Sequence, residues 1–535
     1  MPMVTLRYDD LEKLIGADKD TIIDRIPMIG ADVERIDEEY MDVEFFPDRP
    51  DLFSVEGVAR AMRGFLEIET GLTRYDVKSS NVSITIEESI KPIRPHLACA
   101  VVRGLHLDDS SIEPLMSLQE NLHWGIGRDR KKVSIGVHDL SKIKPPFVYK
   151  AVDPKIEFVP LDFDCPFTMH KILEMHPKGI KFAHILNEMK SYPLIVDAGE
   201  NVLSFPPIIN SALTMVTDRT KDLFIEVTGM DTSVAVALNI VVTALAERGG
   251  IIESVKIVSN GSAKKMPHLS PTTRSLQVEE VNSLLGLNLN AEKIAINLEK
   301  MRFGATIHEY EIKVDVPAYR ADILHNWDLI EDVAIGYGYD RFKPAFPETS
   351  TIGKTHYIED KFELLTDVMV GLGFSEVMTF TLTNEKVHFE NMRRIRAQVT
   401  KVKHPISMDQ TMIRSSILPS LMEILSFNKH HDLPQKIFEV GDALLDGKNA
   451  QLIACASIHS KANFAEIKSI AEAVMREIRT EFTIEEAHDP AFLEGRRAYV
   501  VVDGKRLGAF GEIHPDVILS FGLDHPVVAF ELDIS

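Results

Sequence analysis

Two segments of this chain, about 270 residues apart, repeat the same order of predicted elements. Residues 6–16 and 276–286 both have helical spacing of apolar residues, and both end in glycine, the residue expected at a helix C-cap. In each copy a second helix, a strand, a proline-led turn and a third helix follow. The shared order predicts a duplicated helix–strand module. Such units are typical of nucleic-acid binding, but a small packing module is an equally good interpretation because neither copy is basic.

The length of the chain requires more than these two modules. It has 535 residues, and a rule of roughly 150 residues per domain predicts about three to four domains. Residues 98–106, 153–163 and 377–382 are predicted strands. Residues 230–248 and 358–372 are predicted helices. We therefore predict a multidomain α+β protein with four units, at residues 1–80, 85–258, 270–345 and 350–535.

The balance of charge limits what the chain can bind. Its formal net charge is −22, whereas a protein that binds nucleic acid over its whole surface is basic, because phosphate contacts supply most of the affinity. The chain can therefore contact RNA only locally or through a basic partner. Its three widely separated cysteines indicate neither a disulfide framework nor a zinc site. No apolar run is long enough to span a bilayer and no signal peptide is evident, so we expect a cytoplasmic protein without a membrane partner.

Four acidic residues lie close together in the second copy of the module. Asp328, Glu331 and Asp332 have i, i+3, i+4 spacing and share one helical face, over which Asp322 can fold back. A set of oxygen ligands without cysteine or clustered histidine favours Mg²⁺. Acidic residues are also favoured in the first turn of a helix, so helix capping explains the pattern equally well.

The first copy of the module restricts where a metal is expected. It keeps two of the acidic positions, as Asp51 and Glu56, but has Phe53 and Gly57 at the other two. A metal site is therefore expected only in the second copy. We predict a structural role for the metal, because the second copy lies outside both larger units.

Motifs spread over most of the chain resemble those of phenylalanyl-tRNA synthetase β subunits. The run DRPDLFSVEGVAR at residues 48–60 resembles the N-terminal signature of that family. The runs LHWGIGRDR at 122–130 and HPKG at 176–179 resemble the archaeal and eukaryotic branch. Any one motif is weak evidence, but their shared order is specific. Further matching motifs lie at residues 135–139, 205–211, 320–339, 404–407, 414–419 and 438–441.

The resemblance implies an (αβ)₂ enzyme that joins phenylalanine to tRNA(Phe) through phenylalanyl-adenylate, with ATP bound mainly by the α subunit. It implies a class II synthetase-like antiparallel-sheet domain at residues 350–535, and Mg²⁺ on the four carboxylates. This chain departs from the class II motifs, since Arg414 is followed by Ser415 and no arginine follows Arg506. We therefore expect that domain to pack against the α subunit rather than to catalyse.

The resemblance also places a hydrolytic editing domain at residues 85–258. An apolar pocket rejects an added hydroxyl poorly, so removal of tyrosine attached in error to tRNA(Phe) needs a second site. Asn210, Ser211, Glu226 and Thr228 are the candidate editing residues. As alternatives, the first two could cap a helix and the last two could be strand surface.

The densest basic cluster comprises Arg128, Arg130, Lys131 and Lys132. It could contact tRNA phosphate, although a solvated loop is the usual role of such a cluster. Two other functions stay open. A free-standing editing hydrolase would leave the large C-terminal unit unexplained, and the acidic balance counts against a nucleic-acid-binding module.

Overall fold

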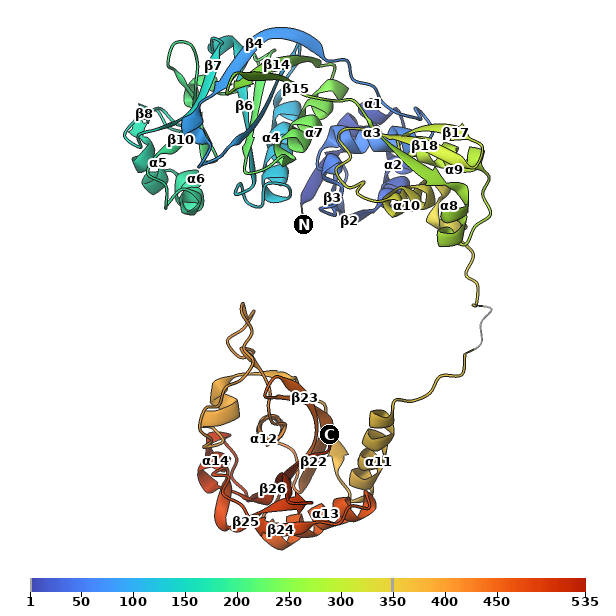
Figure 1. The fold of residues 1–535 in the computed structure, drawn as a ribbon, viewed down its shortest axis with the longest axis vertical. Coiled ribbons are helices and arrows are strands. Elements are labelled where there is room, and N and C mark those ends of the chain that lie inside the picture. The colour runs from blue at the N-terminus through green and yellow to red at the C-terminus, as the bar shows by residue number, and fades with distance from the viewer. Residues whose placement is uncertain (1, 348–350) are drawn as a thin grey trace. The chain divides into compact units, whose positions relative to one another are not determined.

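The computed structural model describes residues 2–347 and 351–535, apart from the side chains of residues 109 and 110. The chain forms two compact units, Met1–Ala345 and Phe346–Ser535, which Figure 1 colours from blue to red along the sequence. Three of the four predicted units therefore fall within the first compact unit. No described helix has the length and apolar character needed to cross a membrane.

The N-terminal module is a three-stranded antiparallel sheet, in the order β1-β3-β2, with three helices. Alternating burial along β3 directs Met41, Val43 and Phe45 into the core. Its elements are β1 (Met3–Arg7), α1 (Tyr8–Ile15), α2 (Lys19–Arg25), β2 (Ala31–Ile36), β3 (Tyr40–Phe45) and α3 (Val55–Phe65).

The second module repeats this topology, with the strand order β16-β18-β17. Gly16 and Gly286 cap the first helix of each copy with φ of 83° and 66°, as predicted. The predicted starts of these helices were wrong, because Leu6 and Leu276 belong to the preceding strands, with their side chains buried. The elements are β16 (Thr272–Gln277), α8 (Val278–Leu285), α9 (Ala291–Lys300), β17 (Gly304–His308), β18 (Glu311–Val316) and α10 (Asn326–Tyr337).

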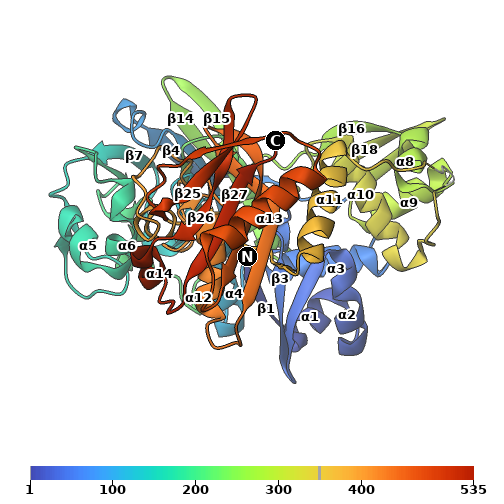
Figure 2. The same cartoon turned by 90° about the horizontal axis from the view of Figure 1, so that it is seen from below.

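Between the two modules lies a domain built on a ten-stranded mixed sheet. Helix α7 packs against β5, β13 and β6, and α4 packs against β6. Figures 1 and 2 both show α5 and α6 at the end of the first unit that lies away from α8 and α9. The sheet order is β12-β11-β10-β7-β4-β14-β5-β13-β6, with β15 on β14.

The strands of this domain are β4 (Lys78–Ile86), β5 (His96–Arg103), β6 (Val133–Asp139), β7 (Phe147–Val152), β10 (Tyr192–Val196), β11 (Val202–Phe205), β12 (Ile209–Asn210), β13 (Leu223–Gly229), β14 (Ile251–Ser259) and β15 (Ser262–Met266). A separate hairpin pairs β8 (Glu157–Phe158) with β9 (Phe167–Thr168). The helices are α4 (Asp109–Trp124), α5 (Met169–Met175), α6 (Pro177–Phe182) and α7 (Ser233–Glu247).

The second compact unit contains a seven-stranded sheet in the order β19-β22-β23-β27-β26-β25-β24. All neighbours pair antiparallel except β19 and β22. Apolar clusters cover both faces: one includes residues of α12 and α14, and the other residues of α11 and α13. The two faces are therefore both buried by helices.

The strands of the second unit are β19 (Ser375–Glu376), β20 (Leu382–Thr383), β21 (Met412–Ile413), β22 (Gln435–Leu445), β23 (Lys448–Ile458), β24 (Thr483–Glu486), β25 (Phe492–Val502), β26 (Lys505–Ile513) and β27 (Val527–Asp533). The helices are α11 (Tyr357–Gly371), α12 (Leu418–Phe427), α13 (Phe464–Glu477) and α14 (Pro515–Ser520).

Candidate functional site

A cavity of about 360 Å³ lies where the two ends of the ten-stranded sheet approach one another. Its walls come from α4, β6, β11, β12 and the short 3-10 helix η6 (Ala212–Thr214). Twelve of its 22 lining residues are apolar, mostly isoleucine, valine, proline and phenylalanine, and ten are polar or charged. A cavity that combines apolar walls with fixed polar groups suits a small aromatic group that carries a polar substituent. The polar residues in its lining include Glu120, Arg130, Ser134, Ser204, Asn210 and Glu226.

Glu226 supplies a buried carboxylate to this wall. It lies at the middle of β13, which pairs with β5 on one side and β6 on the other, and it is only 2% exposed. The Ser204 hydroxyl donates to its Oε1 at 2.9 Å, whereas Oε2 is buried and has no hydrogen-bond partner in the described part of the chain. Leaving such an oxygen unpaired costs on the order of 1–3 kcal/mol or more. The interpretation of Glu226 as exposed strand surface is therefore wrong.

A buried arginine, Arg94, supports the same wall from behind. Its Nε donates to Thr228 Oγ1 at 3.0 Å, and Nη2 donates to Ser134 Oγ at 3.2 Å and to the Arg130 carbonyl at 3.1 Å. All of its hydrogen-bond acceptors are neutral oxygens, and burial lowers the pKa of Arg94 to about 10. Thr228 is fully buried, so it too is not strand surface.

The four candidate editing residues do not all reach the cavity. Asn210 lines it, and its Nδ2 donates to the Val137 carbonyl of β6 at 3.3 Å, which joins the two ends of the sheet. Ser211 instead caps η6 by accepting the Leu213 backbone N–H, as the capping alternative predicted. Glu226 and Asn210 are therefore the candidates at the cavity, while Ser211 and Thr228 lie behind its wall.

The predicted basic cluster is divided by the fold. Arg130 is only 4% exposed, and its Nη1 donates to the Ile208 carbonyl at 2.8 Å while its Nη2 pairs with Glu120 at 2.6 Å. It is thus a wall residue of the cavity and not part of a solvated loop. Arg128 and Lys131 are exposed.

Three residues that surround Glu226 and Thr228 were not predicted from the sequence as site residues: Arg94, Ser204 and His138. Ser204 reaches Glu226 although β11 and β13 are not neighbours in the sheet. Only the curvature that brings the sheet ends together creates this contact. No spacing in the sequence signals it.

The four predicted magnesium ligands do not form a single ligand set in the described structure. The guanidinium of Arg320 pairs with two of them, Asp322 and Asp332, with Nη2–Oδ2 distances of 2.5 Å in both cases. The first module repeats part of this arrangement, because Arg49 pairs with Asp51 at 2.9 Å.

The other two predicted ligands differ from each other. Asp328 accepts the backbone N–H groups of Leu324 and His325, at 2.7 and 2.6 Å, and so caps α10 as the alternative interpretation predicted. Glu331 forms no ion pair among the described residues. Partial burial, followed by the charges of Asp332 and other nearby carboxylates, raises the pKa of Glu331. A cation at Glu331 would relieve this repulsion.

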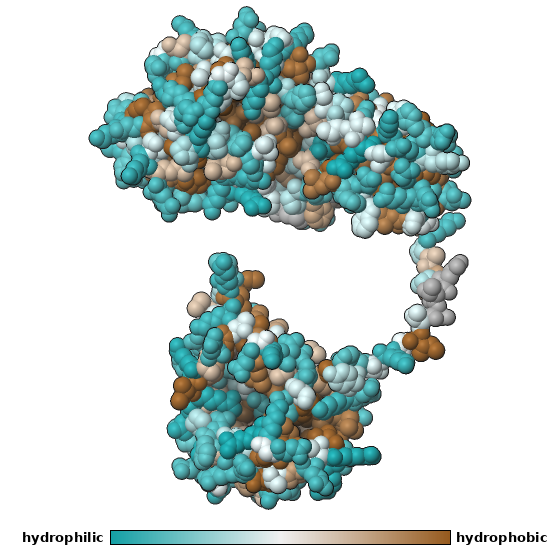
Figure 3. All heavy atoms as spheres, viewed as in Figure 1, coloured by the Kyte–Doolittle hydropathy of each residue, from teal (hydrophilic) through white to brown (hydrophobic). Residues whose placement is uncertain are grey.

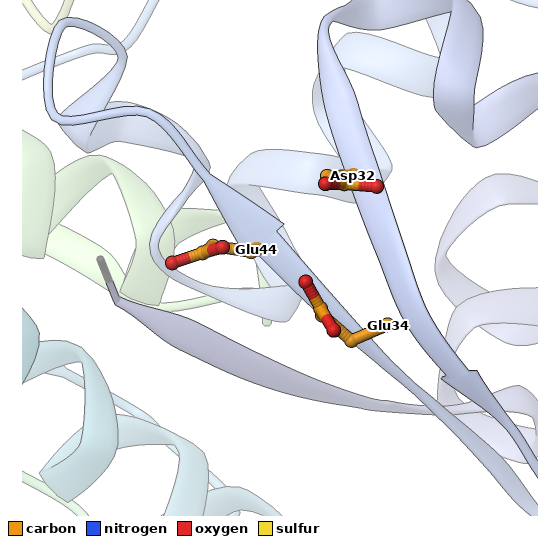
Figure 4. Close-up of side chains that lie close together, drawn as sticks. All are labelled: Asp32, Glu34 and Glu44. Atoms are coloured by element: carbon orange, nitrogen blue, oxygen red, sulfur yellow. The ribbon is translucent and has the colours of Figure 1, made fainter. Parts of the chain in front are cut away.

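A different acidic group does bring three carboxylates together. Asp32 and Glu34 on β2 and Glu44 on β3 each have one carboxylate oxygen within 4.8 Å of the others. Figure 4 shows these three side chains on the two strands. Within residues 2–347 and 351–535, no other group of metal-ligating side chains meets this distance. Asp32 and Glu34 are exposed, and exposed acidic groups are common without a metal, so this group identifies no site.

In the second unit, Arg414 is used for internal contacts. Its side chain is 2% exposed, pairs with Glu439 at 2.7 Å, and donates to the Asp442 carbonyl and to Thr379. Each of its three guanidinium nitrogens therefore has a partner within this unit.

Comparisons with known proteins cover the whole chain. Residues 274–339 match the family described as tRNA synthetase B5 domain, and residues 343–534 match the phenylalanyl tRNA synthetase beta chain CLM domain. The phenylalanine–tRNA ligase beta subunit of Methanosarcina barkeri is 59% identical over 538 residues, covering 100% of this chain and 99% of the relative. The same-named protein of Archaeoglobus fulgidus is 53% identical over 539 residues, covering 100% of this chain and 98% of that protein.

A solved structure also resembles the first compact unit. It is an N-terminal fragment of the phenylalanyl-tRNA synthetase beta subunit from Pyrococcus horikoshii, with a TM-score of 0.61 and 40% identity. The match covers 63% of this chain and 99% of the fragment. On this full-length identity to the archaeal proteins, the chain belongs to the phenylalanine–tRNA ligase beta-subunit family and is a subunit of an aminoacyl-tRNA synthetase.

Proposed function

We propose that this chain acts in the cytoplasm as the β subunit of an (αβ)₂ phenylalanine–tRNA ligase, in which the α subunit uses ATP to attach L-phenylalanine to tRNA(Phe). This chain would supply assembly, tRNA positioning and hydrolytic editing of tyrosyl-tRNA(Phe). Full-length identity to proteins of that name and the matches to the B5 and CLM domains support the assignment. The editing role rests on one observation, the buried Oε2 of Glu226, a cavity-lining residue, which has no hydrogen-bond partner among the described residues.

The chemistry of Glu226 favours tyrosine over phenylalanine. A tyrosine ring in the cavity would donate its phenolic hydroxyl to Oε2, which otherwise stays buried and unpaired. A phenylalanine ring would exclude water from that oxygen without replacing the lost hydrogen bond. Sites that hydrogen-bond a substrate hydroxyl reject the analogue without it by a factor on the order of 10⁴–10⁵. An apolar aminoacylation site discriminates poorly between tyrosine and phenylalanine, whereas this cavity would discriminate strongly between them.

The decisive experiment measures release of tyrosine from tyrosyl-tRNA(Phe) by the αβ holoenzyme carrying Glu226→Ala. Loss of a hydrogen bond to a charged group predicts a decrease of roughly 10- to 100-fold in kcat/KM for editing. Aminoacylation with phenylalanine should be unchanged, because that site is proposed to lie on the α subunit. Thr228→Ala should also weaken editing, since Thr228 helps Arg94 to support the wall. Wild-type release at the rate of a heat-inactivated enzyme would contradict the proposal.

The second compact unit offers a surface for the α subunit. Met378, Phe380, Met408 and Phe427 are large apolar side chains that are 94%, 77%, 79% and 73% exposed, and they line one hollow of about 1130 Å³. Figure 3 shows apolar residues among the hydrophilic ones on the visible surface of this unit. Large exposed apolar surfaces mark interaction sites. Neither a free-standing hydrolase nor a nucleic-acid-binding module explains such a surface.

The proposal includes Mg²⁺ at Asp322, Asp328, Glu331 and Asp332, but the described arrangement does not fit a metal as it stands. Arg320 neutralises Asp322 and Asp332, and Asp328 is used as a helix cap. A cation at these carboxylates would have to displace the guanidinium. Partial burial and, after it, the charges of nearby carboxylates raise the pKa of Glu331, and a cation there would offset the second of these two causes.

A further inference from the structure

A second buried titratable side chain lies beside Glu226. His138, on β6, is 0% exposed, and its Nε2 lies 3.9 Å from Glu226 Oε1. Its Nδ1 lies 2.8 Å from Thr214 Oγ1 on η6. Both Nε2 of His138 and Oε2 of Glu226 are buried without a hydrogen-bond partner. Two adjacent buried groups with unpaired atoms are rare in folded proteins and call for an explanation.

The contacts of Thr214 indicate which ring nitrogen carries hydrogen. Its hydroxyl has one hydrogen to donate. The two carbonyls in its reach, of Ser211 and Leu203, already accept the backbone N–H groups of Thr214 and Ser211. Nδ1 of His138 is the closest acceptor and has no other donor. Because Nε2 faces the carboxylate oxygen Glu226 Oε1, which can only accept, the tautomer with hydrogen on Nε2 is favoured, and Nδ1 then accepts from the Thr214 hydroxyl.

The backbone makes room for this pair. Gly136 lies directly opposite Glu226 across β6 and β13. A Cβ at Gly136 would lie 2.4 Å from Glu226 Oε1 and 2.8 Å from His138 Nε2. Any other residue there would push the two side chains apart. The absence of a side chain at Gly136 thus lets the imidazole and the carboxylate share one space behind the cavity wall.

We propose that His138 is a positioning residue for editing, which holds Oε1 of Glu226 on the buried side so that Oε2 faces the ligand. This inference rests on the proposed editing function. A distance of 3.9 Å is longer than a hydrogen bond, and such contacts in ligand-free sites often shorten when the ligand binds. Ser204 and His138 would then both donate to Oε1, fixing the rotation of the carboxylate.

The experiment compares two substitutions that differ in which nitrogen they keep. His138→Gln can place a donor near the position of Nε2, whereas His138→Asn can place one only near Nδ1. The readout, with the αβ holoenzyme, is the ratio of kcat/KM for hydrolysis of tyrosyl-tRNA(Phe) to that of phenylalanyl-tRNA(Phe). We expect His138→Gln to retain this ratio within about 3-fold, and His138→Asn to lower it roughly 10-fold, the value of a lost hydrogen bond to a charged group.

A double substitution separates positioning from simple packing. If His138 acts through the carboxylate, His138→Asn added to Glu226→Gln should lower the ratio no further than Glu226→Gln alone. Equal losses in the Gln and Asn variants, or additive losses in the double variant, would overturn the role of His138 while leaving editing intact. A wild-type holoenzyme that does not release tyrosine would overturn editing and this inference together. Thermal unfolding of each variant checks that it folds. If a His138 variant does not fold, Thr214→Val takes its place in the comparison with Glu226→Gln, because this substitution removes the hydroxyl that contacts Nδ1 of His138.

Discussion

The guanidinium of Arg320 decides what the carboxylates around it can do. It holds Asp322 and Asp332 in ion pairs that are almost fully buried, where an unpaired charge would be costly. A metal bound by Asp322 and Asp332 would take both carboxylates from Arg320 and leave the guanidinium without these two ion-pair partners. The spacing of the acidic residues in the sequence predicted their proximity, but it could not show that an arginine two positions from Asp322 competes for the same oxygens.

The role of Asp328 can be tested by stability alone. Asp328→Ala removes the acceptor for two backbone N–H groups at the start of α10, so we expect the free energy of unfolding of the first unit to fall by about 1 kcal/mol in EDTA. Asp328→Asn keeps an acceptor oxygen and should cost less. Chemical denaturation followed by circular dichroism measures both.

A magnesium titration extends this test. If Mg²⁺ binds the quartet, it should raise the stability of the wild type and not that of Asp328→Asn, because binding to the folded state stabilises it. Asp340→Ala, an exposed acidic residue in the same module, is the matched control. Equal stability of Asp328→Ala and the wild type in EDTA would contradict the capping role.

The family resemblance predicted Glu226 and Asn210 as site residues, and in the structure both residues line the cavity. The partners of Glu226 could not be predicted in the same way. Ser204 reaches it through curvature of the sheet, which no local pattern encodes, and His138 reaches it from the neighbouring strand β6, which is distant in the sequence. The burial of Arg130 was missed because its neighbours in the sequence are charged and exposed.

At the scale of elements, regular patterns predicted the helices well and the strands poorly. The helices expected at 230–248 and 358–372 are α7 and α11, and the strand expected at 98–106 is β5. The strand expected at 153–163 was wrong, because only Glu157–Phe158 forms a strand there, beside an isolated bridge at Pro160, and prolines flank the pair.

The strand expected at 377–382 was also wrong, and for a different reason. Alternating apolar residues predicted that one face would be buried, but Met378 and Phe380 are exposed. Apolar alternation indicates a strand only when the apolar face meets a core of the same chain. The prediction of a duplicated module was more accurate than these strand predictions, because the orders β1-β3-β2 and β16-β18-β17 repeat the same topology.

The contact between the modules gives a prediction at this scale. Gly64, in α3, approaches the second module so closely that a Cβ would lie 2.3 Å from the Lys300 carbonyl and 2.6 Å from Arg302 Cδ. Gly64→Ala should therefore destabilise the first unit by about 1–3 kcal/mol, the usual cost of overpacking. Faster hydrogen exchange of the backbone amides in α3 and α9 would measure this loss of stability.

The control for Gly64 is another helical glycine with open space around it. Gly371, in α11, has no heavy atom within 4 Å of an added Cβ. Gly371→Ala should stabilise its helix slightly, since alanine has the higher helix propensity. If both substitutions had the same effect, close packing of the modules at Gly64 would be refuted.

At the scale of the whole molecule, the acidic balance and the apolar surface of the second unit point to function in an assembly. A chain with a net charge of −22 gains little from RNA phosphates by itself, so a basic partner would have to supply much of the tRNA contact. The exposed Met378, Phe380, Met408 and Phe427 indicate where such a partner would pack.

Replacing Met378 and Phe380 together by serine tests this surface. We expect the double variant to lose co-purification with the α subunit at equal stoichiometry, because apolar area buried at the interface is removed. Sedimentation velocity of the isolated chain should in turn show less self-association than the wild type. Ile352→Ser, an equally exposed apolar residue outside the hollow, is the control. Retention of the α subunit by the double variant would contradict the proposed surface.

The same four side chains bear on how a cell must make this protein. If the α subunit covers this surface, a copy synthesised without that partner would expose the four side chains to solvent, where they would bind other unpaired copies or the chaperones and proteases that recognise exposed apolar residues. Excess copies would then be lost instead of accumulating. Matched synthesis of the two subunits, for example from a shared transcript, would follow from the hydrophobic effect at this surface and not from any requirement of the catalytic chemistry.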